Sequence, residues 1–507
     1  MKKITAFSLI ACLTLITSCK KDLLDTGPTG SSDDQAIFTT TTNSANVING
    51  IYRYLYSRYS DQNQPGQGGI MLNMDFMGED LHQSVATWYT TAGSGTGGWV
   101  SQKNDASGWV SYPFRLYYRC IGNANALIEN IDAATGTDAD KKRLKAEALT
   151  MRAWSYFNLV QIFGKRYVAG TTNSQLGVSM PLKPLDLKLP RSTVEQVYTQ
   201  INKDLDDALT LFASGNPLPV GLSSSASNLK SHLSLNAARA IKARVALTQQ
   251  NWVTAAAFAK QVVDAGAYSL MSNAQYESGF NNITNPEWIW GAYVQDDQGD
   301  TFGSYFAQIS WDGNTTYIRS RPKRINSALY NQISTTDVRK KMWEPAPTAA
   351  NFPLPLSTYI REPYMSRKFK TRTTPTIGDV PYIRLAEMYL IMAEAYANIP
   401  GRETDARNAL FTLAKNRDAN YTLSTNSGQA LINEILIQRR VELWGEGFRF
   451  FDLKRLDQPL DRTVVPNYVS ASVGGVMQVG SPSTDNRWQF AIPIAEIQAN
   501  PNTSQND

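Results

Sequence analysis

The feature that most constrains this fold is one long helical stripe in the first third of the chain. Between residues 138 and 163, apolar and small side chains recur at three- and four-residue spacing, which predicts a helix with one buried face. The stripe consists of Leu144, Ala148, Met151, Ser155, Leu159 and Ile162. Gly164 follows as a helix stop. A helix of this length needs other helices to cover its stripe, so the sequence predicts a mainly α-helical protein.

Two pairs of shorter segments indicate how the helices assemble. Residues 235–248 carry alanines at a spacing that allows close helix approach, and residues 252–264 form the predicted return helix. Residues 382–397 and 404–417 repeat this arrangement across Gly401. Such antiparallel pairs resemble tetratricopeptide units, although no fixed period of about 34 residues is present.

The rest of the chain alternates between predicted helices and long loops. Residues 36–60 and 113–132 show helical spacing, whereas residues 61–112 are rich in Gly, Ser, Asn and Gln and are predicted to be loops. A further helix is expected over 191–212, with Ser192 as its cap and Glu195 completing a capping box. Residues 280–378 are expected to hold short strands and loops inserted between the hairpins.

The first nineteen residues predict export. Two lysines precede an apolar run that is too short to span a bilayer and is typical of a signal peptide. Small residues then lead to Cys19, which resembles the lipid-acceptor position of a bacterial lipoprotein. We predict a signal peptide over 1–18, a lipidated tether over 19–35 and one domain over 36–507, with an N-terminal part at about 36–225 and a C-terminal part at about 280–507. An ordinary secretory signal with an unrelated cysteine is the alternative.

Charge and cysteine content narrow the possible partners. A formal charge of +5 over 507 residues is too small to indicate a nucleic-acid-binding protein. After removal of the signal and lipidation of Cys19, only Cys120 would remain, so no disulfide within the chain is possible. The protein must therefore be stable through its core. Two basic stretches, 319–324 and 367–372, are expected to be solvated faces.

Catalytic and metal-binding motifs are missing from the sequence. The two histidines, His82 and His232, are not spaced as metal ligands, and neither HExxH nor GxSxG occurs. Residues 93–98 match GxGxxG, but a dinucleotide site needs a strand before the motif and a helix after it, and no helical run opens here, so we interpret them as a flexible loop. The acidic run 296–300 could offer oxygens to calcium but lacks the EF-hand spacing. We expect a protein that is not an enzyme and needs neither a cofactor nor a metal.

Four segments together resemble the SusD/RagB family of outer-membrane nutrient-binding lipoproteins. They are KAEALTMRAWSYFNLVQIFG at 145–164, RST at 191–193 with the helix after it, the pair YIRLAEMYLIMAEAY at 382–396 and RRVELWGEGFRFFDLKR at 439–455, and IPIAE at 492–496 with NP and QN near the C-terminus. The resemblance implies a SusD-like superhelix of tetratricopeptide-like pairs with long loops and a few short strands. It also implies a SusC-like TonB-dependent transporter as partner, a cell-surface location and no catalysis. We expect the charged residues of 439–455 to form ion pairs of the scaffold.

The ligand is expected to bind on loops. Family members that bind glycans use loops before the helix that starts here near Phe114 and loops in the middle insertion. Sugar rings stack their C–H faces on flat aromatic side chains, and sugar hydroxyls need polar partners. The candidate residues are Trp88, Trp99, Trp109, Tyr305, Trp311, Asn314 and Tyr317. The competing interpretation is that these aromatic residues anchor the loops to the body. By contrast, Trp154, Trp252 and Trp444 lie in helical patterns and are expected to be core residues. The sequence predicts a glycan-binding lipoprotein, with a RagB-like peptide-binding lipoprotein and a lid with little affinity of its own as alternatives.

Overall fold

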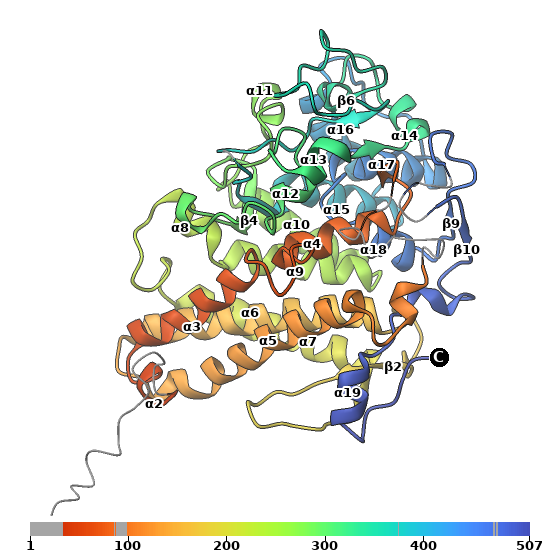
Figure 1. The fold of residues 1–507 in the computed structure, drawn as a ribbon. Helices are drawn as coiled ribbons and strands as arrows, with labels where there is room; N and C mark the ends of the chain where they lie inside the picture. Colours follow the sequence, from red (N-terminus) through yellow and green to blue (C-terminus); the bar gives the residue numbers. More distant parts are fainter. Residues whose placement is uncertain (1–33, 86, 88–98, 374, 470–471, 473–474) are drawn as a thin grey trace, which may run out of the picture.

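The structure, a computed structural model, describes residues 34–85, 87, 99–373, 375–469, 472 and 475–507 (Figure 1). Helices form most of it, as predicted. The first long helices lie at the lower side in Figure 1, the helices of residues 385–455 lie at the upper right, and the last helix, over residues 494–499, lies at the bottom. The signal peptide, Cys19 and Trp88 lie outside the described residues.

The scaffold consists of long helices that pack largely in sequence order, together with a few short helices. Their bounds are α2 (Asp34–Ile37), α3 (Thr41–Tyr54), α5 (Gly108–Asn130), α6 (Asp138–Phe163), α7 (Val194–Ser214), α8 (Ala226–Ser231), α9 (Leu235–Thr248), α10 (Trp252–Asp264), α15 (Leu385–Ala397), α16 (Glu403–Arg417), α17 (Gly428–Glu442), α18 (Arg449–Arg455) and α19 (Ile494–Ala499). Helix α6 packs between α5 and α7, α9 packs on α10, and α10 packs on α15, which pairs with α16. The predicted hairpins are therefore confirmed, and α10 joins the two hairpins that the sequence indicated. In the described part of the chain, no helix combines the length and apolarity that a membrane crossing requires.

The start of α7 differs from its prediction by one residue. Thr193 is the cap: its side chain accepts from the backbone of Gln196, whose side chain accepts in return from the backbone N–H of Thr193. Ser192 is instead held in the short strand β3 (Arg191–Thr193), which pairs with β2 (Leu176–Ser179). The capping box is therefore formed by Thr193 and Gln196, one residue later than the predicted pair of Ser192 and Glu195.

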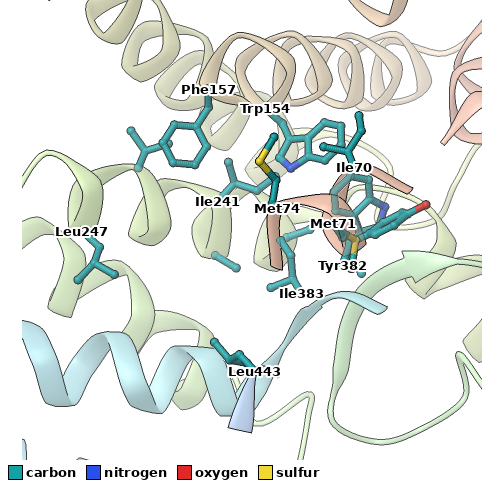
Figure 2. Packing of buried hydrophobic residues seen from close by; sticks show 14 of the residues in the cluster. Ile70, Met71, Met74, Trp154, Phe157, Ile241, Leu247, Tyr382, Ile383 and Leu443 are labelled. Atoms are coloured by element: carbon teal, nitrogen blue, oxygen red, sulfur yellow. The ribbon is translucent and has the colours of Figure 1, made fainter. Parts of the chain in front are cut away.

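A helix that the sequence did not predict crosses the interior. Helix α4 (Gly66–Phe76) lies within the segment expected to be loops, and every one of its residues is buried. Figure 2 shows Ile70, Met71 and Met74 among the side chains of α6, α9 and β8. A helix buried all round carries no amphipathic stripe, and its glycines lower its helix propensity, so its pattern could not reveal it.

Short strands lie in the middle of the chain, as predicted, together with short helices that the sequence did not predict. Four strands form a sheet in the order β1 (Leu81–His82), β5 (Arg324–Ile325), β7 (Met365–Ser366) and β6 (Trp343–Glu344). Two further pairs are β4 (Trp288–Ala292) with β8 (Val380–Arg384) and β9 (Leu460–Asp461) with β10 (Gln478–Val479). The short helical segments are η2 (Ser101–Lys103), η3 (Ile131–Ala133), α11 (Asn273–Tyr276), η4 (Asp296–Gln298), α12 (Phe306–Ile309), α13 (Thr316–Ser320), α14 (Ser327–Asn331), η5 (Val338–Met342) and η6 (Asn486–Trp488).

Charged side chains lie at the centre of the scaffold. We call the following set the central charge cluster: Glu287, Arg339, Lys368, Arg384, Arg417, Glu442 and Glu446, all of them buried. The carboxylate of Glu442, at the end of α17, forms salt bridges with the guanidinium groups of Arg417 at 3.0 Å and Arg339 at 3.3 Å. It also pairs with Arg384 on β8. The carboxylate of Glu446 forms salt bridges with both Arg384 and Lys368, each at 2.7 Å. The cluster ties the β4–β8 pair to the C-terminal helices.

The ion pairs expected within residues 439–455 are present. Arg439 pairs with Asp452 at 2.7 Å, and Arg455 pairs with Asp452 at 2.8 Å. The expectation that both basic stretches are solvated is wrong, because Lys323 and Lys368 are buried. Lys368 is neutralised by the cluster, and Lys323 donates to the carbonyl of Arg321.

Candidate functional site

Two of the tryptophans expected on ligand-binding loops lie in the core. Trp99 is 1% exposed, and its ring meets Trp488 at a centroid distance of 4.4 Å and Phe450 at 5.6 Å. Trp109, near the start of α5, is 2% exposed and packs edge-on against Phe490. Neither ring presents a face on which a sugar could stack, so here both act as loop anchors, which was the competing interpretation.

Tyr305 is also a scaffold residue. Its ring lies against Gly68 of α4, where an added Cβ would come within 2.7 Å of the ring. Its hydroxyl donates to the carbonyl of Gly445 at 2.7 Å, and burial raises the pKa of this hydroxyl well above its ordinary value. Tyr305 thus joins α4, α12 and the turn after α17, and it is not available to a ligand.

The remaining candidates lie on α13 or in the turn before it. Tyr317 on α13 donates its hydroxyl to Gln83 at 2.8 Å, and the ammonium of Lys323 lies 4.1 Å from its ring centroid. Asn314 is exposed, and Trp311 is half-buried with its ring edge-on to Phe352 at 5.6 Å. Of the core expectations, Trp154 and Trp444 are buried as predicted, whereas Trp252 is half-buried.

A cleft of about 440 Å³ lies along α13, and we call it the α13 cleft. Its lining residues are Gln62, Thr87, Phe302, Thr315, Thr316, Tyr317, Ser320 and Arg321. Phe302 is 47% exposed, an unusual exposure for a large aromatic side chain in a protein whose other rings are mostly buried. The sequence analysis identified Tyr317 here and missed Phe302, although the aromatic ring in a Gly- and Asp-rich stretch was a usable signal.

The lining of the α13 cleft is suited to binding a hydroxyl-bearing ligand. Its lining offers the ring of Phe302, several hydroxyls, one amide and the guanidinium of Arg321, and it contains no carboxylate. Glycoside hydrolysis requires a pair of carboxylates flanking the bond, so this lining can bind a sugar without cleaving it. Thr315 caps α13 through its Oγ1, which accepts from the backbone of Ile318 and so fixes the short helix that presents Tyr317.

The carboxyl groups with the most strongly lowered pKa values lie away from the α13 cleft, although burial beside the cleft lowers the pKa of Lys323 well below its ordinary value. Burial alone would raise the pKa of Glu442, but Arg417, Arg384 and Arg339 together hold it well below its usual range. Burial likewise opposes ionisation of Glu79, yet Arg449 and Arg440 lower its pKa to about 2. These carboxylates are saturated with guanidinium partners, which indicates scaffold ion pairs.

The two histidines do not form a metal site. His82 is fully buried and stacks on Tyr468 at 4.3 Å, and burial lowers its pKa well below the ordinary value. His232 lies edge-on to Tyr52, with Nε2 at 2.9 Å from the amide oxygen of Asn49. Across the described ranges, no group of three or more His, Cys, Asp and Glu side chains could hold a metal ion. Cys120 is buried, and burial raises the pKa of its thiol to about 12.

Comparison with known proteins gives consistent matches along the chain. Residues 30–247 match a SusD-like family model described as starch-binding and associating with the outer membrane, and residues 260–507 match the SusD family model. A SusD-like protein of Formosa agariphila is 23% identical over 454 residues, which cover 78% of this chain and 79% of the relative.

Solved structures share the fold over nearly the whole chain. A SusD-like carbohydrate-binding protein from Bacteroides vulgatus is 25% identical with a TM-score of 0.74, covering 92% of this chain and 97% of that one. A SusD superfamily protein from Bacteroides thetaiotaomicron is 24% identical with a TM-score of 0.75, covering 92% of this chain and 100% of that one.

Proposed function

The chain belongs to the SusD family of carbohydrate-binding proteins, whose members associate with the outer membrane and are not enzymes, and from this premise we propose that it captures an oligosaccharide at the α13 cleft. The observation that carries the proposal is the exposed ring of Phe302 beside the hydroxyl-rich surface of α13. A sugar stacks on such a ring through its C–H face and exchanges hydrogen bonds with the surrounding hydroxyls. The B. vulgatus relative is itself described as carbohydrate-binding, which supports this ligand class.

Trp311 and Asn314 extend the proposed site. Three residues separate Trp311 from Thr315, so their Cα atoms are four steps of the chain and at most about 14 Å apart. Asn314 is exposed and provides both a donor and an acceptor at the same end of α13. Together they would contact sugar units beyond the one stacked on Phe302.

The captured oligosaccharide would then pass to a SusC-like TonB-dependent transporter in the outer membrane. Lipidation at Cys19 would hold the protein at that membrane through acyl chains, without a spanning segment. The test is fractionation of cells that carry the Cys19→Ala variant. We expect the variant to leave the membrane fraction, and retention there would contradict the lipid anchor.

Affinity electrophoresis tests the glycan site directly. The chain from Lys20 to Asp507, which contains every described residue, is run through gels holding neutral or acidic polysaccharides. We expect one glycan to retard the wild type, and Phe302→Ala to abolish most of that retardation. Leu423→Ala is a matched control, because Leu423 is also 47% exposed but lies between α16 and α17. Retardation by no glycan, together with capture of a peptide from a mixed library, would favour the RagB-like alternative.

A further inference from the structure

A second concave surface lies at the end of α3, and it shares no lining residue with the α13 cleft. It consists of two adjoining cavities of about 270 and 230 Å³, which have Arg53, Tyr56 and Gln298 in common. We call them together the α3 groove. One wall is the last turn of α3 and residues 55–58, and the other is the segment 290–300 that runs from β4 into η4. The N-terminal helices and the middle segment therefore build this groove jointly.

Aromatic rings provide the floor and the sides of the α3 groove. Trp290 and Tyr382 are buried at its base, with ring centroids 4.9 Å apart. Tyr56 and Tyr293 are half-buried, so part of each ring faces the groove. The hydroxyl of Tyr56 donates to the amide oxygen of Gln298 at 2.7 Å, which fixes the ring between the two walls.

Amide groups supply the hydrogen-bonding capacity. The oxygen of Asn49 is held by His232, and its NH₂ group has no partner within the described part of the chain. The NH₂ group of Gln298 likewise has no partner among the described residues, while the side-chain oxygen of Gln298 accepts a hydrogen bond from Tyr56. Gln295 is exposed on the same wall. The amides of Asn49 and Gln298 are each oriented through the side-chain oxygen and offer the NH₂ group to a ligand.

The charge of the groove is close to neutral. Arg58 pairs with Asp300 at 3.2 Å at one end, which leaves only Arg53 uncompensated among the lining residues. A phosphate or nucleic acid requires several cations or clustered backbone donors. An apolar ligand would leave the amide donors without partners, at a cost of about 1–3 kcal/mol for each buried one.

We propose that the α3 groove is a second glycan-binding site, which takes another stretch of the same neutral polysaccharide chain. The inference rests on the proposed function, because it assigns the same ligand class. Asp300 of the groove and Phe302 of the α13 cleft are two residues apart, so the two surfaces adjoin through the segment 300–302. A polymer lying across both would gain affinity from the second contact, since the second binding event is intramolecular.

The experiment compares a long polysaccharide with a short oligosaccharide of the same sugar, using the Lys20–Asp507 chain and calorimetry. Tyr293→Ala is expected to weaken binding of the polymer about tenfold, which corresponds to the loss of one stacked ring. Gln295→Ala, an exposed substitution that cannot disturb the core, should weaken it by a smaller factor in the same direction. Leu423→Ala serves again as the control. With the short oligosaccharide, the wild type should bind two molecules, and Tyr293→Ala should bind one.

The outcomes separate this inference from the proposed function. If Phe302→Ala loses polymer binding while Tyr293→Ala and Gln295→Ala match the wild type, the groove is not a glycan site and the α13 cleft stands. If the groove variants lose binding and Phe302→Ala does not, the α3 groove alone is the site and the placement at α13 is wrong. Absence of glycan binding by the wild type would overturn both.

Discussion

The central charge cluster and the α13 cleft show opposite uses of polar side chains. In the cluster, Glu442 is surrounded by three guanidinium groups and is buried completely. In the cleft, hydroxyls and one exposed ring line an open surface without a carboxylate. The densest charge in this molecule therefore holds the scaffold together, and the sparsely charged surface is the one suited to a ligand.

The comparison warns against taking perturbed ionisation as a mark of function here. Strongly shifted pKa values often identify active sites, but buried ion-pair networks shift them as well. Glu442, Glu79 and Asp452 all have pKa values below their usual range because arginines surround them. Glu442 and Glu79 pair with arginines from distant segments, whereas Asp452 pairs with Arg439 and Arg455 close to it in the chain. None of the three carboxylates lines the α13 cleft.

Replacing Glu442 should give the largest effect. Glu442→Ala removes the shared partner of Arg339, Arg384 and Arg417, and it leaves buried guanidinium charge uncompensated. We expect a loss of about 3–5 kcal/mol in the free energy of unfolding, measured by urea denaturation. Asp264→Asn is the control, because Asp264 also pairs with a cation, Lys260, but is 57% exposed. Equal losses in both variants would show that the cluster is not what stabilises this region.

Removing the buried indole of Trp99 should give the second-largest loss in the free energy of unfolding. Trp99→Ala empties the space between Trp488 and Phe450, and we expect a cost of about 3 kcal/mol in the free energy of unfolding. If glycan binding per folded molecule stays at the wild-type value, Trp99 is an anchor. A stable variant that no longer binds glycan would contradict the structural role assigned to this ring.

The family segments could be predicted from the sequence, and so could the long helices α3, α5 and α7, because their apolar residues recur along one face. Helix α6 was also predicted, but it is buried on nearly every side from Arg143 onward and not along one stripe alone. The ion pairs of 439–455 were predictable as a class, but their partners were not, since Glu79, Arg384 and Arg417 come from distant segments. The site was predictable only in part. Tyr317 lines the α13 cleft, whereas Trp99 and Trp109 turn inward, and a loop sequence does not record which way its ring points.

Acid should weaken the Glu79 ion pairs selectively. The pKa of Glu79 is about 2 in the folded chain, below its ordinary value of 4.5, so its contribution to stability is present above the ordinary pKa and is lost as the pH falls toward 2. The difference in unfolding free energy between the wild type and Glu79→Gln should therefore shrink by roughly 2 kcal/mol between pH 7 and pH 3. Urea denaturation of both proteins at four pH values measures this difference in unfolding free energy. A difference that is constant with pH would mean that Arg440 and Arg449 do not set the ionisation of Glu79.

Replacing Trp311 should give the smallest change in the free energy of unfolding. The same variant tests whether Trp311 belongs to the scaffold or contacts the ligand. Its ring is half-buried against Phe352, so Trp311→Ala removes part of a hydrophobic contact, and we expect a loss of about 1 kcal/mol in the free energy of unfolding. Its remaining surface is free to stack on a sugar, so the same variant should bind glycan about tenfold more weakly. Trp311→Phe keeps a flat ring and should recover most of the affinity, although it restores less of the buried area. If stability falls and glycan affinity does not change, Trp311 is an anchor like Trp99 and Trp109. The proposed ligand contacts would then be limited to Phe302 and the hydroxyls of α13.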